Sequence, residues 1–200
     1  SGLSYSDLVI DIIVNKDYVY LLAMDSLSIY DRLLNTRVGL VRRTENQLLF
    51  NTMCVSKSQV YIGTNDGIYV ISKTSMLKSD SESFLNLKYS YSSLGGKNVK
   101  HLAYNNVGGI DYLAATHEGG MTLIINDGQY ISKLLAADSN PGDVYITNKG
   151  QIYYGNGVDG VYFINSPNFR ETINLRIPFE DYLYTTLPSK TVKDISVSED

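Results

Sequence analysis

The segment YIGTNDGIYVIS, from Tyr61 to Ser72, decides the fold. Its two outer runs are rich in Tyr, Val and Ile, which favour the pleated, half-buried surface of a strand. Asp66 and Gly67 lie between them, and Asp-Gly is a strong hairpin signal because glycine accepts the positive φ of a tight turn. The segment therefore predicts a β-hairpin.

Three other segments repeat this pattern of strand, polar turn with an acid, and second strand. They are YLLAMDSLSIYD from Tyr20, YLAATHEGGMTLII from Tyr112 and YYGNGVDGVYFIN from Tyr153. The leading tyrosines thus recur at a nearly regular spacing, which is widest between the second and third segments. Self-similarity at such a period indicates a repeat architecture. The recurring tyrosines are interpreted as packing residues between repeats.

An earlier strand precedes each hairpin, and a less regular extended stretch follows it. The earlier strands are VIDIIVNKD from Val9, NTMCVSKSQ from Asn51, VKHLAYNN from Val99 and DVYITNKGQ from Asp143, and the pattern returns as VKDISVSED from Val192. The later stretches lie around residues 38–42, 84–91, 129–135 and 172–182. Each unit thus holds four strands, named A to D in chain order, which predicts an all-β fold.

Four-stranded units of this length are typical of the blades of a β-propeller. We expect one propeller domain or fragment over residues 1–200, with antiparallel blades at about 7–47, 48–95, 96–138 and 139–189 and the first strand of a fifth at 190–200. A closed ring of four has no place for that strand, so the propeller is expected to be partial or open. An unpaired edge invites self-association. A sandwich or barrel with four internal repeats is the structural alternative.

The stretch VYIGTNDGIYVI, from Val60 to Ile71, resembles the repeat of two-component-regulator propellers and, more loosely, quinoprotein-like blades. The shared features are an aromatic residue, Gly-Thr, Asp-Gly and an alternating strand. The chain has no Trp, so it lacks the Gly-His and Trp-Asp pairs of WD repeats, and it has no kelch pattern. The resemblance implies the β-propeller superfamily and a ligand-sensing role, without indicating one family.

Composition limits the classes of function. Apolar residues make up 44% and charged residues 19%, which is usual for a soluble globular domain. No apolar run reaches the ~20 residues that cross a bilayer, and no signal peptide is visible. The net charge of −4 argues against a nucleic-acid partner, which requires a basic face. A single cysteine, Cys54, excludes an intrachain disulfide. The compartment is not indicated.

The turns between strands B and C carry the candidate binding residues. In an A-B-C-D blade these turns share one face with the links between strand D and the next strand A. The candidates on this face are Asp25, Asp66, His117, Glu118, Asp159, Arg42 and Arg43. One carboxylate per blade would suit a cation, a basic partner or a polar ligand, although an acid before Gly or Ser is also ordinary turn chemistry. His117 is expected to be exposed.

No catalytic residue, metal site or cofactor is predicted. His101 falls in an A strand near the expected channel, where a core or lining role is favoured, and Cys54 is interpreted as a small buried hydrophobe. The hypothesis is a non-enzymatic interaction or scaffold propeller that binds a protein or another macromolecule. Alternatives are a structural component of a virion or cell-surface particle, a ligand-sensing propeller, and a propeller hydrolase or lyase with acids around His101.

Overall fold

The computed structural model describes residues 8–33, 36–43, 45–77, 85–89, 94–125, 133–134, 141–156, 160–164 and 175–177. These residues form four antiparallel sheets of four strands each. Blade 1 contains β1 (Val9–Val14), β2 (Tyr18–Ala23), β3 (Ser26–Asp31) and β4 (Arg37–Arg42). Blade 2 contains β5 (Phe50–Val55), β6 (Gln59–Thr64), β7 (Gly67–Ser72) and β8 (Asn86–Tyr89).

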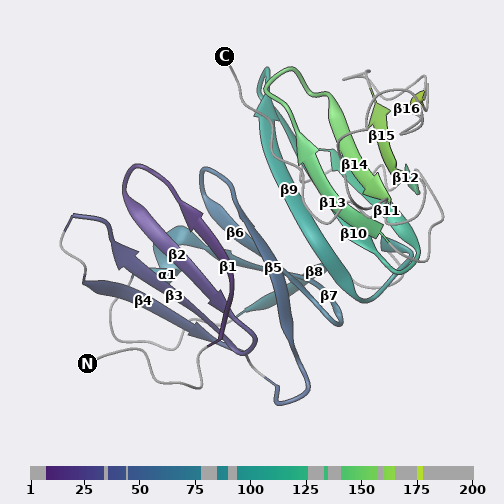
Figure 1. Cartoon of the computed structure of the whole chain (residues 1–200). Coiled ribbons are helices and arrows are strands. Elements are labelled where there is room, and N and C mark those ends of the chain that lie inside the picture. The colour runs from purple at the N-terminus through teal and green to yellow at the C-terminus, as the bar shows by residue number, and fades with distance from the viewer. Residues whose placement is uncertain are drawn as a thin grey trace, which may run out of the picture.

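The other two sheets follow the same plan. Blade 3 contains β9 (Val99–Val107), β10 (Ile110–His117), β11 (Gly120–Ile125) and β12 (Lys133–Leu134). Blade 4 contains β13 (Pro141–Ile146), β14 (Ile152–Asn156), β15 (Gly160–Ile164) and β16 (Leu175–Ile177). Within every blade the strands pair in chain order. Figure 1 shows blades 1 and 2 side by side, with blades 3 and 4 overlapping on the right. Contacts between consecutive blades place blades 1 and 4 at the two ends of the row.

The repeat seen in the sequence is also a repeat of strand register. Leu21 lies opposite Ile12 in blade 1, and Ile62, one repeat further along the chain, lies opposite Met53 in blade 2. The tight turn of blade 2 requires Gly67, because its φ of 101° is unfavourable for a residue with a side chain. The prediction of four A-B-C-D blades is therefore confirmed for the described residues.

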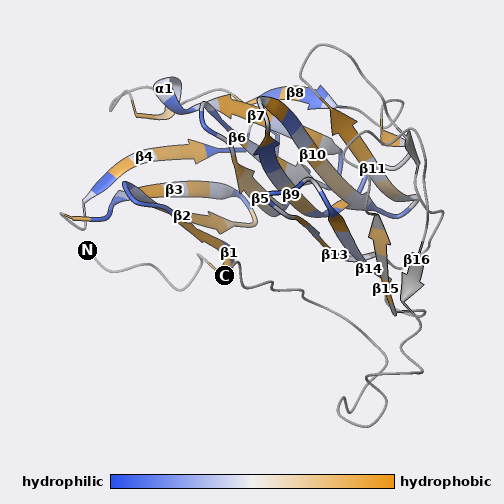
Figure 2. Ribbon diagram, turned by 90° about the horizontal axis from the view of Figure 1, so that it is seen from above, coloured by the Kyte–Doolittle hydropathy of each residue, from blue (hydrophilic) through white to orange (hydrophobic). Residues whose placement is uncertain are grey.

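Three apolar layers fill the space between consecutive blades. Between blades 1 and 2 the layer includes Tyr20, Leu22, Leu27, Ile29, Met53, Val60, Ile62 and Ile71. Between blades 2 and 3 it includes Cys54, Tyr61, Ile68, Val70, Leu102, Leu113, Ala115 and Ile124. Between blades 3 and 4 it includes Tyr112, Ala114, Met121, Leu123, Val144, Ile146, Ile152 and Tyr154. Figure 2 shows the hydrophobic strands, in orange, facing one another across these layers.

The recurring tyrosines serve this packing. Tyr20, Tyr61 and Tyr112, which begin the first three hairpins, are 1%, 5% and 2% exposed. Each side chain of this size contributes on the order of 1.5–3 kcal/mol when it leaves water. Their predicted role between blades is therefore confirmed.

Three observations complete the description of the chain. A single helical turn, α1 (Lys73–Met76), follows β7 and buries Met76. No helix in the described ranges is long and apolar enough to span a bilayer. The expected fifth A strand at residues 190–200 lies outside the described residues.

Candidate functional site

The predicted binding residues lie at the B–C turns and the links beside them. Asp25 is in the turn between β2 and β3, Asp66 in the turn between β6 and β7, and Glu118 in the turn between β10 and β11. Arg42 ends β4, and the backbone N–H of Arg43 donates to the carbonyl oxygen of Asp25 at 3.0 Å. Asp159 lies outside the described residues. We refer to the described turns and to the link residues 43, 45–49 and 94–98 as the B–C face.

Hydrogen bonds join each described turn of the B–C face to a link. The backbone N–H of Asn65 donates to the carbonyl oxygen of Leu49 at 3.1 Å, and the Leu49 N–H donates to Asn65 Oδ1 at 2.8 Å. Asn65 Nδ2 also donates to the carbonyl oxygen of Gln47 at 2.9 Å. The Gly67 N–H reaches the carbonyl oxygen of Lys97 at 2.8 Å. These hydrogen bonds therefore fix the backbone of the turns relative to the links.

Glu118 joins its turn to a link through both oxygens of its carboxylate. Its Oε1 accepts the backbone N–H of Lys97 at 2.6 Å and its Oε2 accepts that of Asn98 at 2.7 Å. Desolvation opposes ionisation of the carboxyl group, but the N–H groups of Lys97 and Asn98 outweigh it and lower the pKa of Glu118. The side chain therefore acts as an anionic clamp on the link that enters β9.

His117 is completely buried, whereas the sequence led us to expect an exposed residue. The hydroxyl of Thr122 donates to the carbonyl oxygen of Leu94 at 2.5 Å, so its oxygen accepts from Nε2 of His117 at 2.9 Å. Nδ1 of His117 accepts the Gly119 N–H at 3.1 Å. This arrangement assigns the neutral tautomer with the proton on Nε2. Burial lowers the pKa of His117, which keeps the ring neutral.

The remaining candidates differ in how far their side chains are exposed to solvent. Asp66 and Arg42 are exposed. Asp25 is partly buried and accepts a hydrogen bond from the Ser26 hydroxyl at 3.0 Å. Arg43 is partly buried, and its Nη1 donates to the carbonyl oxygen of Leu48 at 3.4 Å. Asp66 and Arg42 thus present charge to solvent, while Asp25 and Arg43 also stabilise the turns.

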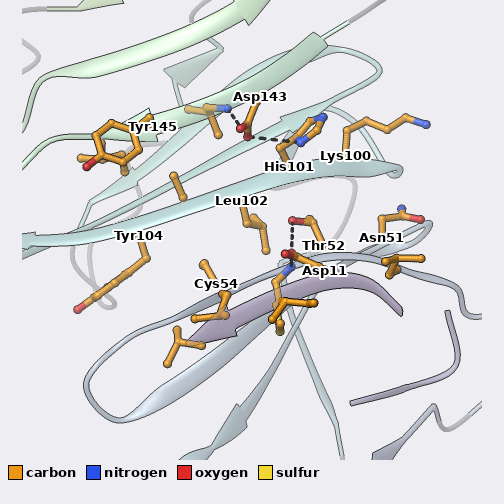
Figure 3. A pocket seen from close by; sticks show the side chains of 18 residues that line it. Asp11, Asn51, Thr52, Cys54, Lys100, His101, Leu102, Tyr104, Asp143 and Tyr145 are labelled. Carbon is orange, nitrogen blue, oxygen red and sulfur yellow. Dashed lines mark hydrogen bonds and ion pairs between the residues drawn. The ribbon is translucent and has the colours of Figure 1, made fainter. Parts of the chain in front are cut away.

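A second candidate site lies among the four A strands. β1, β5, β9 and β13 line a polar cavity of about 760 Å³, which occupies the position of the expected channel. Figure 3 shows Asp11 and Thr52 on one side of it and His101 and Asp143 on the other. Lys100 also lines the cavity.

Two acids of this cavity have definite partners. Asp143 Oδ1 is 3.4 Å from Nδ1 of His101, and it accepts the backbone N–H of Val144 at 2.8 Å. Asp11 Oδ2 accepts the Met53 N–H at 2.9 Å and the Thr52 hydroxyl at 3.3 Å. These contacts join blade 3 to blade 4 and blade 1 to blade 2 at the channel wall (Figure 3).

Sequence reasoning found His101 but missed Asp11 and Asp143. A signal was present, because Asp11 interrupts the apolar strand VIDIIV and a charge inside such a strand requires a polar partner. Cys54, also on the channel wall, is 6% exposed, and burial raises the pKa of its thiol. It is the small buried hydrophobe that was expected. Within the described ranges, no three His, Cys, Asp or Glu side chains gather as a metal site requires.

Comparison with known proteins identifies the architecture. No family model and no curated protein matches the chain. Solved structures do match, including the extracellular domain of BT4673 from B. thetaiotaomicron, with a TM-score of 0.64 and 17% identity. The WD40 repeats of RRP9 match with 0.62 and 13%, and the β-propeller domain of Cps50 (Swd1) from Myceliophteria thermophila with 0.52 and 9%.

The fold is a β-propeller. The three matches cover 84%, 83% and 76% of this chain. The chain in turn spans 24%, 50% and 48% of theirs, so it corresponds to a half or less of each. At these identities the likeness shows the fold alone, a β-propeller of repeated all-β blades.

Proposed function

We propose that this chain is a non-enzymatic interaction propeller that holds a protein partner against its B–C face. The observation that supports the proposal is that the backbone of this face is fixed by hydrogen bonds while apolar, basic and acidic side chains on it are exposed. Met24 is 46% exposed in the first B–C turn. Arg42 and Asp66 are exposed close to the first and second turns.

The tied backbone supports binding because little conformational entropy remains to be lost. A surface that is already ordered by hydrogen bonds avoids part of the cost of association. Met24 offers an adaptable apolar contact, and arginines such as Arg42 are enriched where protein interfaces concentrate their binding energy. Charges of both signs select partners by complementarity. A protein surface with an apolar centre and mixed charges fits this face.

The proposal is tested by exchanging charge on the B–C face without changing net charge. The variant carries Arg42→Glu and Asp66→Lys. Its matched control carries Lys16→Glu and Asp17→Lys, which alters two exposed residues of the turn between β1 and β2, at the other end of the strands. Each tagged chain is cross-linked in extract of the source cells, and partners are quantified by mass spectrometry.

We expect partners of the unmodified chain to be lost with the Arg42 and Asp66 variant and kept by the control. Loss in both variants, or in neither, would contradict the B–C face as the binding surface. Circular dichroism of both variants checks that the strands are retained.

The cavity supports a second candidate function, a propeller hydrolase or lyase. The observation that favours it is the contact between His101 and Asp143, since an acid beside a histidine orients the ring and stabilises its protonated form. His101 would act as the general base toward a small polar substrate in the cavity. The Thr52 hydroxyl donates to Asp11 on the opposite side of the cavity from His101 (Figure 3), so the nucleophile that His101 would activate is a water molecule.

Chromogenic esters and glycosides provide a direct test of that activity. We expect turnover by the unmodified chain and its loss in both His101→Gln and Asp143→Asn. The Arg42 and Asp66 variant of the B–C face is the control and should retain activity. Turnover that persists in His101→Gln, or absent turnover in every chain, would remove this candidate.

A further inference from the structure

Each blade has two apolar faces with different neighbours. We call the side that packs on the preceding blade the leading face and the side that packs on the following blade the trailing face. In blade 2, Met53 and Ile62 belong to the leading face, because they pack in the layer shared with blade 1. Tyr61 and Ile68 belong to the trailing face, because they pack in the layer shared with blade 3. Cross-strand register extends this assignment to every blade.

The leading face of blade 1 is an apolar surface at the end of the row. Ile12 lies opposite Leu21 and corresponds in register to Met53 of blade 2. Met53 is 2% exposed, whereas Ile12 is 58% exposed. Val14, on the same face, is 53% exposed and lies opposite Val19.

The same face continues across the sheet. Val19 lies opposite Tyr30, and both are partly buried. Their counterparts in blade 2, Val60 and Ile71, are 0% and 2% exposed beneath blade 1. The leading face of blade 1 is therefore apolar over β1 and β2, with its first strand exposed to solvent. On β3 and β4 the same face adds Ser28, opposite Leu21, and Arg37, opposite Tyr30.

Blade 4 presents the opposite surface at the other end of the row. Tyr153 lies opposite Phe163, with ring centroids 4.8 Å apart, and Gly155 lies opposite Val161. By register, Val161 corresponds to Leu27 of blade 1, which is fully buried against blade 2. Val161 and Phe163 are only partly buried. The trailing face of blade 4 is thus an aromatic and aliphatic surface that matches the trailing faces in the interior of the row.

We propose that a second copy of this chain occupies both surfaces, so that two chains close one eight-bladed ring. Blade 4 of each copy packs its trailing face, with Val161 and Phe163, on the leading face of blade 1 of the other copy, with Ile12 and Leu21. A two-fold axis makes the two junctions identical and covers both end faces of the four described blades. Eight blades fall within the usual range of four to eight.

Continuity with the interfaces already present within the chain supports this occupant. Three junctions of a trailing face with a leading face are formed between blades 1, 2, 3 and 4. The surfaces left at the ends are one trailing face and one leading face, and each has apolar side chains at the positions that pack between blades within the row. An apolar surface of this kind on a soluble protein marks an interaction site. The inference does not depend on the proposed role of the B–C face.

Sedimentation velocity over a wide range of protein concentration tests the proposal. The chain has a mass of 22.3 kDa, and we expect a species of two chains. Ile12→Glu places a charge in both junctions and should give one chain. The matched control is Leu33→Glu, at an 89% exposed position in the turn after β3, and it should keep two chains. Urea unfolding confirms that Ile12→Glu is folded.

A mixing experiment tests the pairing of unlike faces. Val161→Glu alters only the trailing face of blade 4 and should also give one chain. An equal mixture of Ile12→Glu and Val161→Glu should restore a two-chain species, because one junction then has two unmodified faces. A single chain at every concentration, two chains in Ile12→Glu, an open polymer, or no restoration in the mixture would overturn the proposal. A single chain would instead indicate coverage by another part of a longer protein.

Discussion

Replacement of His117 by glutamine should remove a specific part of the pH dependence of stability. Burial lowers the pKa of His117 in the folded protein below its usual 6.5, although the carboxylate of Glu118 acts in the opposite direction. Between the lowered folded pKa and about 6.5, the unfolded chain binds more protons than the folded chain. The stability that depends on the neutral ring is therefore fully present above about pH 6.5 and is lost as the pH falls through the lower folded pKa.

The loss of stability in His117→Gln has two parts, the proton that the ring binds in acid and the two hydrogen bonds that the ring makes. One titrating group gives a slope of at most about 1.4 kcal/mol per pH unit between the unfolded and folded pKa values. At neutral pH, His117→Gln disturbs the bonds to Thr122 and Gly119, and a buried group left without its partner costs about 1–3 kcal/mol. Glutamine can restore at most part of this geometry.

Urea unfolding between about pH 5 and pH 8, where histidine changes charge, measures both quantities. We expect the unmodified protein to lose stability toward pH 5, His117→Gln to be less stable at pH 8 and flatter toward acid, and His101→Gln to keep the loss toward acid. His101→Gln is a matched control because it is the same substitution at the only other histidine. If His101→Gln removes the slope and His117→Gln leaves it, the assignment of a neutral buried ring is refuted.

Three further perturbations follow from the described contacts. Glu118→Ala should lower the free energy of unfolding by about 1 kcal/mol, as the loss of a helix cap does, because two backbone N–H groups lose their acceptor. The control Asp66→Ala, at an exposed position, should cost under about 0.5 kcal/mol. Equal losses in the two variants would refute the role of Glu118 in holding the link. Gly67→Ala should cost more than about 2 kcal/mol, because φ is positive and the new Cβ meets the Tyr89 carbonyl; thermal unfolding checks this. Cys54 should react with a thiol reagent only after denaturation, and rapid native labelling would contradict its burial.

The order of the strands could be predicted from the sequence because its signals are local. Asp66 and Gly67 specify a tight turn, and the alternating residues on either side specify which strand pairs with which. Because the pattern repeats at a regular spacing, the same turn could be predicted where the local signal is weaker, as at Asp25. The B–C face followed from this topology, since it needs only the order of strands within a blade.

The environment of particular side chains could not be predicted in this way. His117 is at the end of a strand beside a turn, which locally favours exposure, yet the link at Gly96 packs directly against its ring. A Cβ at Gly96 would collide with Nδ1 of His117, so the absence of a side chain there is what lets the ring be covered. That contact joins segments from two different parts of the chain.

The sequence by itself thus determined the blades, their strand order and the positions of the turns, because hairpins form from neighbouring residues. Only the tertiary structure decided that His101 meets Asp143 and that Ile12 is exposed while its counterpart Met53 is buried. Both facts depend on which blade lies beside which face. The chemistry of Ile12 and Met53 is similar, and their difference arises from neighbours that no local pattern specifies.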